Sequence, residues 1–380
     1  MTPTCPICSA TSWSDPLLAV DRVPVANSRL YASAEEAAAA PSGSLDIRVC
    51  TRCGTGRNLA FEPGLVDYGE GYEDTQAHSP RFVAFATETI DRLVERYGLD
   101  GARTLEIGCG KGDFLRLVCR RTGGPGIGLD PAFSPGALDD DGLDLVFEAR
   151  PYGPGESLEA DLVVCRHTLE HLDDPAALMA AVADNHEPGT VVYLEVPDLT
   201  RILDDGAFWD LYYEHVTYFS PASLAAAAER AGLAVDSVDL AFDDQYVCLT
   251  GRVAGTGDVG SRPWPGHDPG AIAAFTARVD AALSRLRAVV ADRTVCLWGA
   301  SSKAVALVTV APDLVGGALV TDINPRKWGR VLPTGNPVVA PSDLASRGVE
   351  VVVVMNPVYE AEIRADLAES GVDVDVHPLA

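Results

Sequence analysis

The sequence has no run of about eighteen apolar residues and no basic N-terminal segment followed by an apolar one. We therefore expect no membrane partner, and we predict a cytoplasmic location. Basic residues are also few, because 29 Lys and Arg stand against 55 Asp and Glu, for a formal net charge of −26. This balance repels phosphate backbones and the chain has no basic stripe, so we expect no nucleic-acid partner.

The length and composition favour a globular protein of two or three domains. The 380 residues exceed one typical domain, and 47% of them are hydrophobic, which suffices for real cores. Residues 253–270 are dense in glycine and proline and predict a boundary. We expect domains at residues 1–66, 67–254 and 271–380.

Four of the nine cysteines form two CxxC pairs, Cys5 with Cys8 and Cys50 with Cys53. In a reducing compartment such pairs are typical of one tetrahedral zinc ion rather than of disulfides. Four thiolates leave no open coordination position, so the predicted zinc is structural. The alternative is four unrelated cysteines or a redox pair.

The central motif is a short strand-like run, residues 104–107, followed by Gly108, Gly110, Gly112 and an amphipathic helix. Glycines let a ligand approach the backbone, and the start of a helix offers unpaired N–H groups. We therefore expect a small polar ligand over this turn. An ordinary strand-turn-helix without a cofactor is the alternative.

Acidic residues around the turn indicate which ligand it binds. The dinucleotide fingerprint requires a third glycine where Asp113 stands, which weakens a pyrophosphate interpretation. Glu106 suits a cationic or hydroxylated ligand, and Asp130 follows the next predicted strand, where an acid takes ribose hydroxyls. The stretches LEIGCGKGDF and GIGLD resemble motif I and the following acid of class I S-adenosylmethionine (SAM) methyltransferases.

That resemblance implies an α/β fold with a Rossmann-like core and SAM as cofactor. The implied cofactor-binding residues are Glu106, Gly108, Cys109, Gly110, Asp130, Pro131, Arg166 and His167, with Glu148 and Ala149 beside the adenine by fold analogy.

Residues 61–82 precede the core and show no periodicity. They are either a linker or a substrate lid, and we favour the lid because a plain linker does not need Tyr68, Tyr72, His78 and Arg81. A helix is predicted for residues 82–97.

The segment RHTLEHL follows the apolar strand predicted at residues 161–165. His167, Glu170 and His171 match an inverted zinc-protease pattern, but the motif follows a strand directly and the SAM signature precedes it. We expect instead that this loop faces the methyl donor and that His171 lines the substrate cavity. In the alternative, His171 only caps the packing of the helix beneath the loop.

Residues 208–220, FWDLYYEHVTYFS, combine six aromatic side chains with the pair Glu214 and His215. We interpret them as an aromatic-walled pocket in which Glu214 tunes His215 as a general base. A buried histidine bonded to backbone is the alternative.

The last third of the chain predicts a second α/β unit. A long helix at residues 271–293 leads to a strand, residues 295–298, and a glycine turn with Lys303. The stretch NPRKWGR adds Arg326, Lys327 and Arg330, so this unit either receives a phosphate or displays solvated charge.

Taken together, the chain resembles the three-part sugar C-methyltransferases, in which a zinc module, a SAM core and a C-terminal Rossmann-like unit enclose a nucleotide-linked ketosugar. The marks are CPIC with CTRCG, LEIGCGKGDF, LEHLDDP, YYEHVTYFS, and WGASSKA with DINPRKWG. The resemblance implies that Tyr212, Glu214 and His215 form the substrate and base motif, that His171 is the cavity histidine and that Tyr72 is the lid tyrosine.

The sequence also departs from that family. Asp243, Asp244 and Gln245 stand where the sugar enzymes have Gly-Gly-Ser, Ala304 replaces a glycine, and the lid reads TQAHSPR instead of a serine-rich stretch.

The expected reaction is methylation of a carbon next to a ketone. His215, assisted by Glu214, removes the α-proton, and Tyr212 or His171 hydrogen-bonds the enolate oxygen, without a catalytic metal. Tyr68, His78, Arg81, Lys303 and Lys327 are the expected substrate contacts. The alternatives are an O- or N-methyltransferase for another small natural-product intermediate, and a SAM-binding regulatory or scaffold protein.

Overall fold

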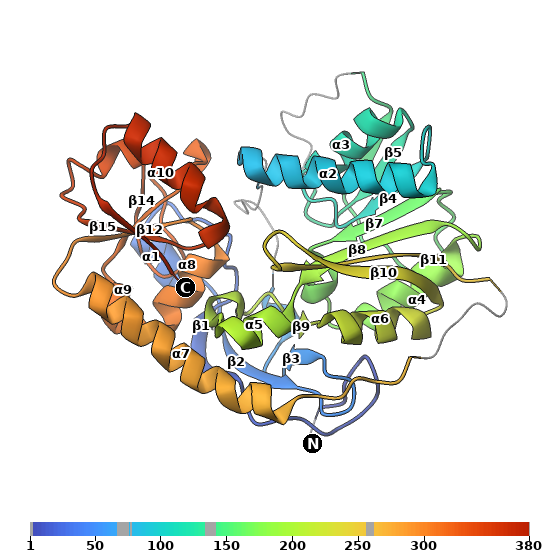
Figure 1. Ribbon diagram of the computed structural model, residues 1–380, viewed down its shortest axis with the longest axis horizontal. Coiled ribbons are helices and arrows are strands. Elements are labelled where there is room, and N and C mark those ends of the chain that lie inside the picture. The colour runs from blue at the N-terminus through green and yellow to red at the C-terminus, as the bar shows by residue number, and fades with distance from the viewer. Residues whose placement is uncertain (1–2, 67–75, 77, 134–141, 256–261, 380) are drawn as a thin grey trace.

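The computed structural model describes residues 3–66, 76, 78–133, 142–255 and 262–379. Three β-sheets organise the chain, of four, seven and five strands. In Figure 1 the seven-stranded and five-stranded sheets form two lobes, and the four-stranded sheet lies below and between them. The long helix α7 (Pro269–Val290) runs beneath and connects the core to the C-terminal lobe.

The seven-stranded sheet has the order β10-β11-β8-β7-β4-β5-β6. Its strands are β4 (Thr104–Ile107), β5 (Gly126–Leu129), β6 (Leu145–Glu148), β7 (Leu162–Arg166), β8 (Val191–Pro197), β10 (Leu233–Ala241) and β11 (Tyr246–Val253). The first five are parallel and the hairpin β10-β11 is antiparallel, so the α/β prediction is confirmed while the hairpin was not foreseen. Strands β4 and β7 are buried throughout, because helices cover both faces.

Helices α2 and α3 pack on one face of this sheet, and α4 and α6 pack on the other. Their bounds are α2 (Pro80–Tyr97), α3 (Asp113–Thr122), α4 (Pro175–Asn185) and α6 (Pro221–Arg230). The helix predicted for residues 82–97 therefore begins two residues earlier, where Ser79 accepts a hydrogen bond from the N–H of Phe82 as its N-cap.

The four-stranded sheet has the order β1-β2-β3-β9. Its members are β1 (Leu18–Pro24), β2 (Ser42–Val49), β3 (Gly56–Asn58) and β9 (Thr217–Tyr218), with α1 (Ala34–Ala39) and the 3-10 turn η1 (Pro63–Leu65) beside them. Strand β9 comes from the aromatic segment far along the chain and pairs antiparallel with β3. The N-terminal sheet is therefore completed by the residues that surround His215.

The five-stranded sheet is parallel, with the order β14-β13-β12-β15-β16. Its strands are β12 (Val295–Trp298), β13 (Leu319–Thr321), β14 (Val338–Val339), β15 (Val351–Val354) and β16 (Asp375–Pro378). Its remaining elements are α8 (Ser302–Val310), α9 (Pro312–Val315), α10 (Glu360–Glu369), η4 (Pro325–Lys327), η5 (Pro341–Asp343) and η6 (Pro357–Tyr359). The strand order reverses at β12, and in such sheets the crevice at the carboxyl ends of the strands binds ligands.

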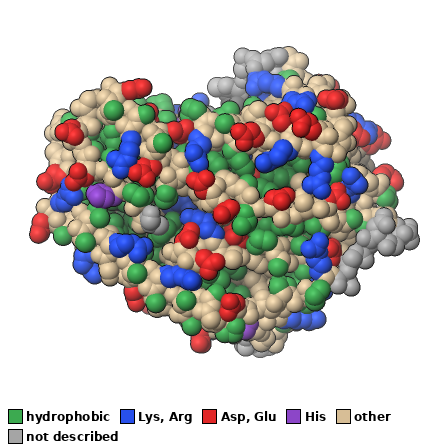
Figure 2. Space-filling model, viewed as in Figure 1, with side chains coloured by type: hydrophobic (Ala, Val, Ile, Leu, Met, Phe, Trp, Pro, Cys, Tyr) green, Lys and Arg blue, Asp and Glu red, His purple; other side chains and the backbone are tan. Residues whose placement is uncertain are grey.

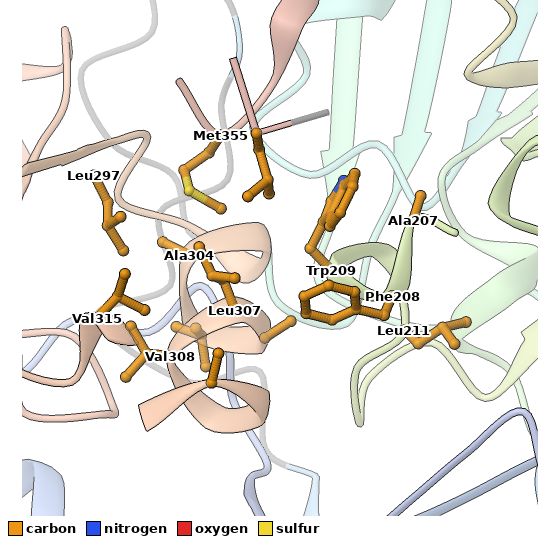
Figure 3. Close-up of a cluster of buried hydrophobic side chains, with 14 of the residues drawn as sticks. Ala207, Phe208, Trp209, Leu211, Leu297, Ala304, Leu307, Val308, Val315 and Met355 are labelled. Carbon is orange, nitrogen blue, oxygen red and sulfur yellow. The ribbon is translucent and has the colours of Figure 1, made fainter. Parts of the chain in front are cut away.

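One hydrophobic core joins the N-terminal sheet to the C-terminal lobe. This cluster includes residues of α5 (Leu199–Asp205) and of the 3-10 turn η3 (Phe208–Asp210), the two elements that follow β8 in the chain and lead to β9. Figure 3 shows Phe208 and Trp209 beside Ala304 and Leu307 of α8. The segment that carries His215 is therefore packed against one lobe and hydrogen-bonded into the N-terminal sheet.

On the face shown in Figure 2, acidic and basic side chains are interspersed. In the described ranges, no helix is both long and apolar enough to cross a membrane.

Candidate active site

A cavity of about 1270 Å³ lies where the three units meet. Its walls come from the glycine turn after β4, the loops after β7 and β8, the segment before β9, and the turns after β12, β13 and β15. The carboxyl ends of both parallel sheets thus open toward the same space, which is where α/β folds bind ligands. Most of the residues predicted as a site line it.

The glycine turn forms the first wall. Gly108 and Gly110 have φ angles of 70° and 53°, a conformation that glycine adopts without strain. A Cβ on Gly108 would lie 2.0 Å from Thr168 Oγ1, so this glycine is also required by packing. Gly110 N–H donates to Asp130 Oδ2 at 2.9 Å. Cys109 and Pro131 line the same wall, so these predicted cofactor residues lie together.

Glu106 lies at the base of this wall and is only 3% exposed. Burial raises the pKa of its carboxyl to about 8, and Asp113 and Asp130 raise it further, against the opposing charge of Arg166. A cationic or hydrogen-bond-donating ligand group would favour the ionised form. This environment fits the amino-acid part of SAM.

Glu148 and Ala149 do not line the cavity, contrary to the adenine placement by fold analogy. Glu148 ends the edge strand β6, and its Oε2 lies 2.5 Å from Arg150 Nε. Ala149 is exposed. On this side the described cavity ends at residues 130–132.

Arg166 and His167 belong to a buried ionic network centred on Glu195, which is inaccessible to solvent. Glu195 Oε1 lies 2.7 Å from Arg166 Nη2 and 2.9 Å from His167 Nε2, and Oε2 accepts a hydrogen bond from Tyr193. Both predicted residues line the cavity, but their charges are used within the protein. Sequence analysis did not identify Glu195, because it is an inward residue of the apolar strand β8.

His167 has a left-handed backbone, with φ of 49°. Burial lowers its pKa, but Glu170 and Glu195 outweigh burial and raise the pKa to about 9. Strained backbone of this kind persists only where neighbouring contacts hold it. His167 is therefore a fixed cation between two carboxylates.

His215 and Tyr212 form the wall opposite the glycine turn. Tyr212 Oη lies 2.6 Å from His215 Nε2, and the rings of His171 and His215 meet edge-to-face with centroids 5.0 Å apart. Burial, then the charges of His171, His167 and Lys303, holds the pKa of His215 well below its ordinary value. His215 is therefore neutral and lines the cavity, and a neutral imidazole there can act as a proton acceptor.

Glu214 does not accompany His215 into the cavity. Its Oε2 accepts a hydrogen bond from Asn27 N–H at 2.7 Å, so the carboxylate faces the segment that follows β1 in the N-terminal unit. A turn at residues 213–214 separates the directions of the two neighbouring side chains. A carboxylate that does lie beside His215 at the cavity wall is that of Glu170, which is 1% exposed.

The aromatic segment is mostly core rather than pocket wall, which corrects the interpretation from sequence. Only Tyr212 of its six aromatic residues lines the cavity. The fully buried members are Phe208, Trp209, Tyr213, Tyr218 and Phe219.

Lys303 and Lys327 line the cavity, but each is neutralised. Lys303 Nζ forms an ion pair with Asp210, a residue not foreseen from sequence. Lys327 Nζ lies 2.9 Å from Asp322 Oδ2 and donates to the carbonyl of Ala300.

Two other cations of the C-terminal unit stay available. Arg326 and Arg330 are exposed and line the cavity, and neither forms an ion pair with a residue in the described ranges.

The proposed lid is only partly described, since Tyr68 and Tyr72 lie outside the described residues. His78 lines the cavity. Arg81 does not, because its guanidinium lies 3.0 Å from Asp243 Oδ1 and its N–H donates to Glu362. Arg81 therefore connects the core to the C-terminal unit instead of contacting a ligand.

The four N-terminal cysteines converge and are buried. Sγ atoms of Cys5 and Cys53 lie 3.6 Å apart, and those of Cys8 and Cys50 lie 3.5 Å apart. Tetrahedral zinc with Zn–S bonds of about 2.3 Å needs sulfur separations of about 3.8 Å. The donor set and its spacing fit one structural zinc ion.

Residues 78–238 match the family model described as "Methyltransferase domain". This part of the chain is thus similar to a methyltransferase domain. C-methyltransferase NovU of Streptomyces niveus is 29% identical over 246 residues, which cover 62% of this chain and 57% of that protein. The ubiquinone biosynthesis O-methyltransferase of Pseudoalteromonas translucida is 28% identical over 161 residues, 36% of this chain and 66% of that protein. Less than two thirds of either relative is thus covered.

Among solved structures, the 1,6-didemethyltoxoflavin-N1-methyltransferase of Burkholderia thailandensis, with 1,6-didemethyltoxoflavin and S-adenosylhomocysteine bound, matches 46% of this chain and 82% of that chain. The identity is 15% and the TM-score is 0.36.

Proposed function

We propose that this protein is a SAM-dependent C-methyltransferase that acts on a carbon next to a ketone, on a nucleotide-linked ketodeoxysugar. The observation that carries the proposal is that the neutral pair His215 and Tyr212 faces the same cavity as the glycine turn with Glu106 and Asp130. The relative NovU, a C-methyltransferase by its name, supports the reaction type.

The wall with Glu106, Gly108, Gly110 and Asp130 would hold SAM. Backbone N–H groups and acids of this wall fit an amino acid and a ribose. When bound, SAM supplies an already activated methyl group, so the protein must add positioning and deprotonation.

His215 removes the proton from the carbon beside the ketone. Tyr212 or His171 donates a hydrogen bond to the oxygen on which negative charge develops. The Tyr212 hydroxyl is suited to this, because burial raises its pKa well above the ordinary value and keeps it protonated. Glu214 supports His215 indirectly, by tying its segment to the N-terminal unit through Asn27.

The nucleotide would lie against the C-terminal unit. Arg326 and Arg330 face the cavity there and are the cations still available for a diphosphate. Of the substrate residues expected from sequence, His78 stays a candidate for direct contact. Lys303 and Lys327 would instead position Asp210 and Asp322, with which they form ion pairs at the cavity.

We further propose that Cys5, Cys8, Cys50 and Cys53 hold a structural zinc ion. Strand β3 begins three residues after Cys53 and pairs with β9, and Asn58 N–H donates to the carbonyl of Val216. Because His215 directly precedes Val216, zinc would stabilise the position of the base without taking part in the reaction.

A second candidate is an O- or N-methyltransferase for another small natural-product intermediate. The ubiquinone O-methyltransferase relatives favour it, as does the turn at Asp243 and Asp244, which departs from the sugar enzymes. A regulatory or scaffold protein that only binds SAM is the third candidate.

The test is incubation with methyl-labelled SAM and a panel of nucleotide-linked ketosugars. We expect label on carbon in at least one sugar. His215→Ala should abolish turnover and leave SAM affinity nearly unchanged, because the two walls are separate. Label on oxygen or nitrogen supports the second candidate, and loss of SAM binding in His215→Ala contradicts the role of the base.

A further inference from the structure

The wall around His215 also brings together three side chains that bind metals. Single ligand atoms of Glu170, His171 and His215 lie within 4.8 Å of one another, and all three residues line the cavity. Val216 N–H donates to the Glu170 carbonyl at 2.7 Å, which ties the two contributing segments together. Two imidazoles and one carboxylate are the ligand set of a transition-metal site with open positions.

Glu170 has buried carboxylate oxygens without a hydrogen-bond partner among the described residues. His167 Nδ1 is an ion-pair neighbour at 3.4 Å from Oε1. His215 Nδ1 is likewise buried and lacks a hydrogen-bond partner among the described residues. Buried polar atoms of this kind are costly unless a ligand satisfies them.

The residues behind Glu170 match the outer layer of a metal site. His167 lies between Glu170 and Glu195, with Nε2 2.9 Å from Glu195 Oε1. Such outer partners fix the orientation of the residues that hold a metal. The cavity in front of the three donors leaves room for further ligands.

We propose that Glu170, His171 and His215 bind one divalent transition-metal ion, with Zn²⁺ and Co²⁺ as representatives. Metal–nitrogen bonds of about 2.0–2.1 Å place tetrahedral ligands about 3.4 Å apart, so ligand atoms that now lie within 4.8 Å of one another close by up to about 1.4 Å around the ion. The ion would be bound by a ring nitrogen of His215, the residue proposed to accept the substrate proton. Metal binding and proton removal therefore exclude one another, a consequence that rests on the proposed function.

The binding test uses the full chain carrying one equivalent of zinc for the four cysteines, titrated with Co²⁺ and followed by the visible absorbance of the bound ion. We expect one further equivalent to bind. Glu170→Gln and His171→Ala should weaken it at least about 10-fold. His377→Ala, on β16 outside the cavity, is the matched control and should bind as the wild type does. SAM binding by each variant shows that it is folded.

Absence of further Co²⁺ uptake, or equal uptake by the wild type and both site variants, overturns the site. Under the proposed function, Co²⁺ should lower kcat for methyl transfer and leave the Kd for SAM unchanged. Uptake without inhibition overturns the mutual exclusion alone. Absence of any methyl transfer contradicts the proposed function, and the Co²⁺ titration still decides whether the site exists.

Discussion

The central and C-terminal units share one local feature, a hydrogen bond from the turn after the first strand to the acid after the second strand, but the surroundings of that acid differ. In the central unit, Gly110 N–H donates to Asp130 Oδ2 at 2.9 Å, and in the C-terminal unit, Ala300 N–H donates to Asp322 Oδ2 at 2.8 Å. Both acids follow the second strand of their sheet. Asp130 is partly exposed and faces the cavity without a basic ion-pair partner in the described ranges, whereas Lys327 neutralises Asp322.

The difference separates two binding chemistries. Asp130 keeps acceptor capacity for ribose hydroxyls, so the central turn suits SAM. Asp322 uses its charge on Lys327, and the nearby Arg326 and Arg330, which pair with no acid among the described residues, suit an anion instead. A shared strand-turn-helix pattern therefore does not establish a shared ligand.

The largest expected effect concerns the buried pair of the C-terminal unit. Asp322→Asn leaves Lys327 buried without its partner and should destabilise the protein by about 3–5 kcal/mol, measured by denaturant unfolding. The double change Asp322→Asn with Lys327→Met should recover most of this loss. Asp130→Asn is the control and should cost much less, and equal losses in the two single variants would contradict the comparison.

Asp130→Ala should reduce SAM affinity at least about 100-fold, because two hydrogen bonds to a charged acceptor contribute about 1.5–3 kcal/mol each. Isothermal titration calorimetry measures the change. The double variant Asp322→Asn with Lys327→Met is the matched control and should bind SAM as the wild type does. If SAM bound more weakly to the double variant than to Asp130→Ala, the C-terminal turn and not the central turn would be the SAM site.

The combined change Arg326→Ala with Arg330→Ala should weaken dTDP binding about 10-fold or more, since charge-assisted contacts to phosphate are lost. SAM affinity should not change. The combined change Arg285→Ala with Arg287→Ala, on α7 and away from the cavity lining, is a charge-matched control. The idea fails if dTDP binds equally well to the double variant and to the wild type.

A pH effect should distinguish the central unit further. In the free protein the pKa of Glu106 is about 8, above its unfolded value, so the stability contribution of the protonated form is lost as pH rises toward and through 8. The melting temperature should fall between pH 6 and pH 9, and Glu106→Gln should flatten this fall. Arg166, Asp113 and Asp130 face the same carboxyl and set its baseline. An unchanged pH slope in the variant would contradict the assigned pKa.

Sequence analysis predicted what local patterns determine. The glycine turn with Glu106 and Asp130, and the two cysteine pairs, depend on short spacings that a fold preserves. Central parallel strands such as β4, β7 and β12 were predicted as apolar runs, whereas the edge strands β14 and β16 and the hairpin β10-β11 were not predicted.

The remaining features depend on tertiary contacts. Glu214 and His215 are neighbours in sequence, but a turn directs them to different units, and Glu170 takes the place beside the base. The sequence predicts a pocket wall for the aromatic segment, whereas the pairing of its strand β9 with β3 and its packing against α8 bury most of it. Neither the placement of Glu170 beside His215 nor the packing of the aromatic segment against distant elements leaves a periodic pattern in the sequence.

The most direct test of the central claim is calorimetric titration of S-adenosylhomocysteine into the full chain, with and without saturating dTDP. The account predicts one site for each ligand, with binding at the first weakened in Asp130→Ala and at the second in the Arg326 and Arg330 double variant. Absence of cofactor binding, or competition of both ligands for one turn, would contradict it.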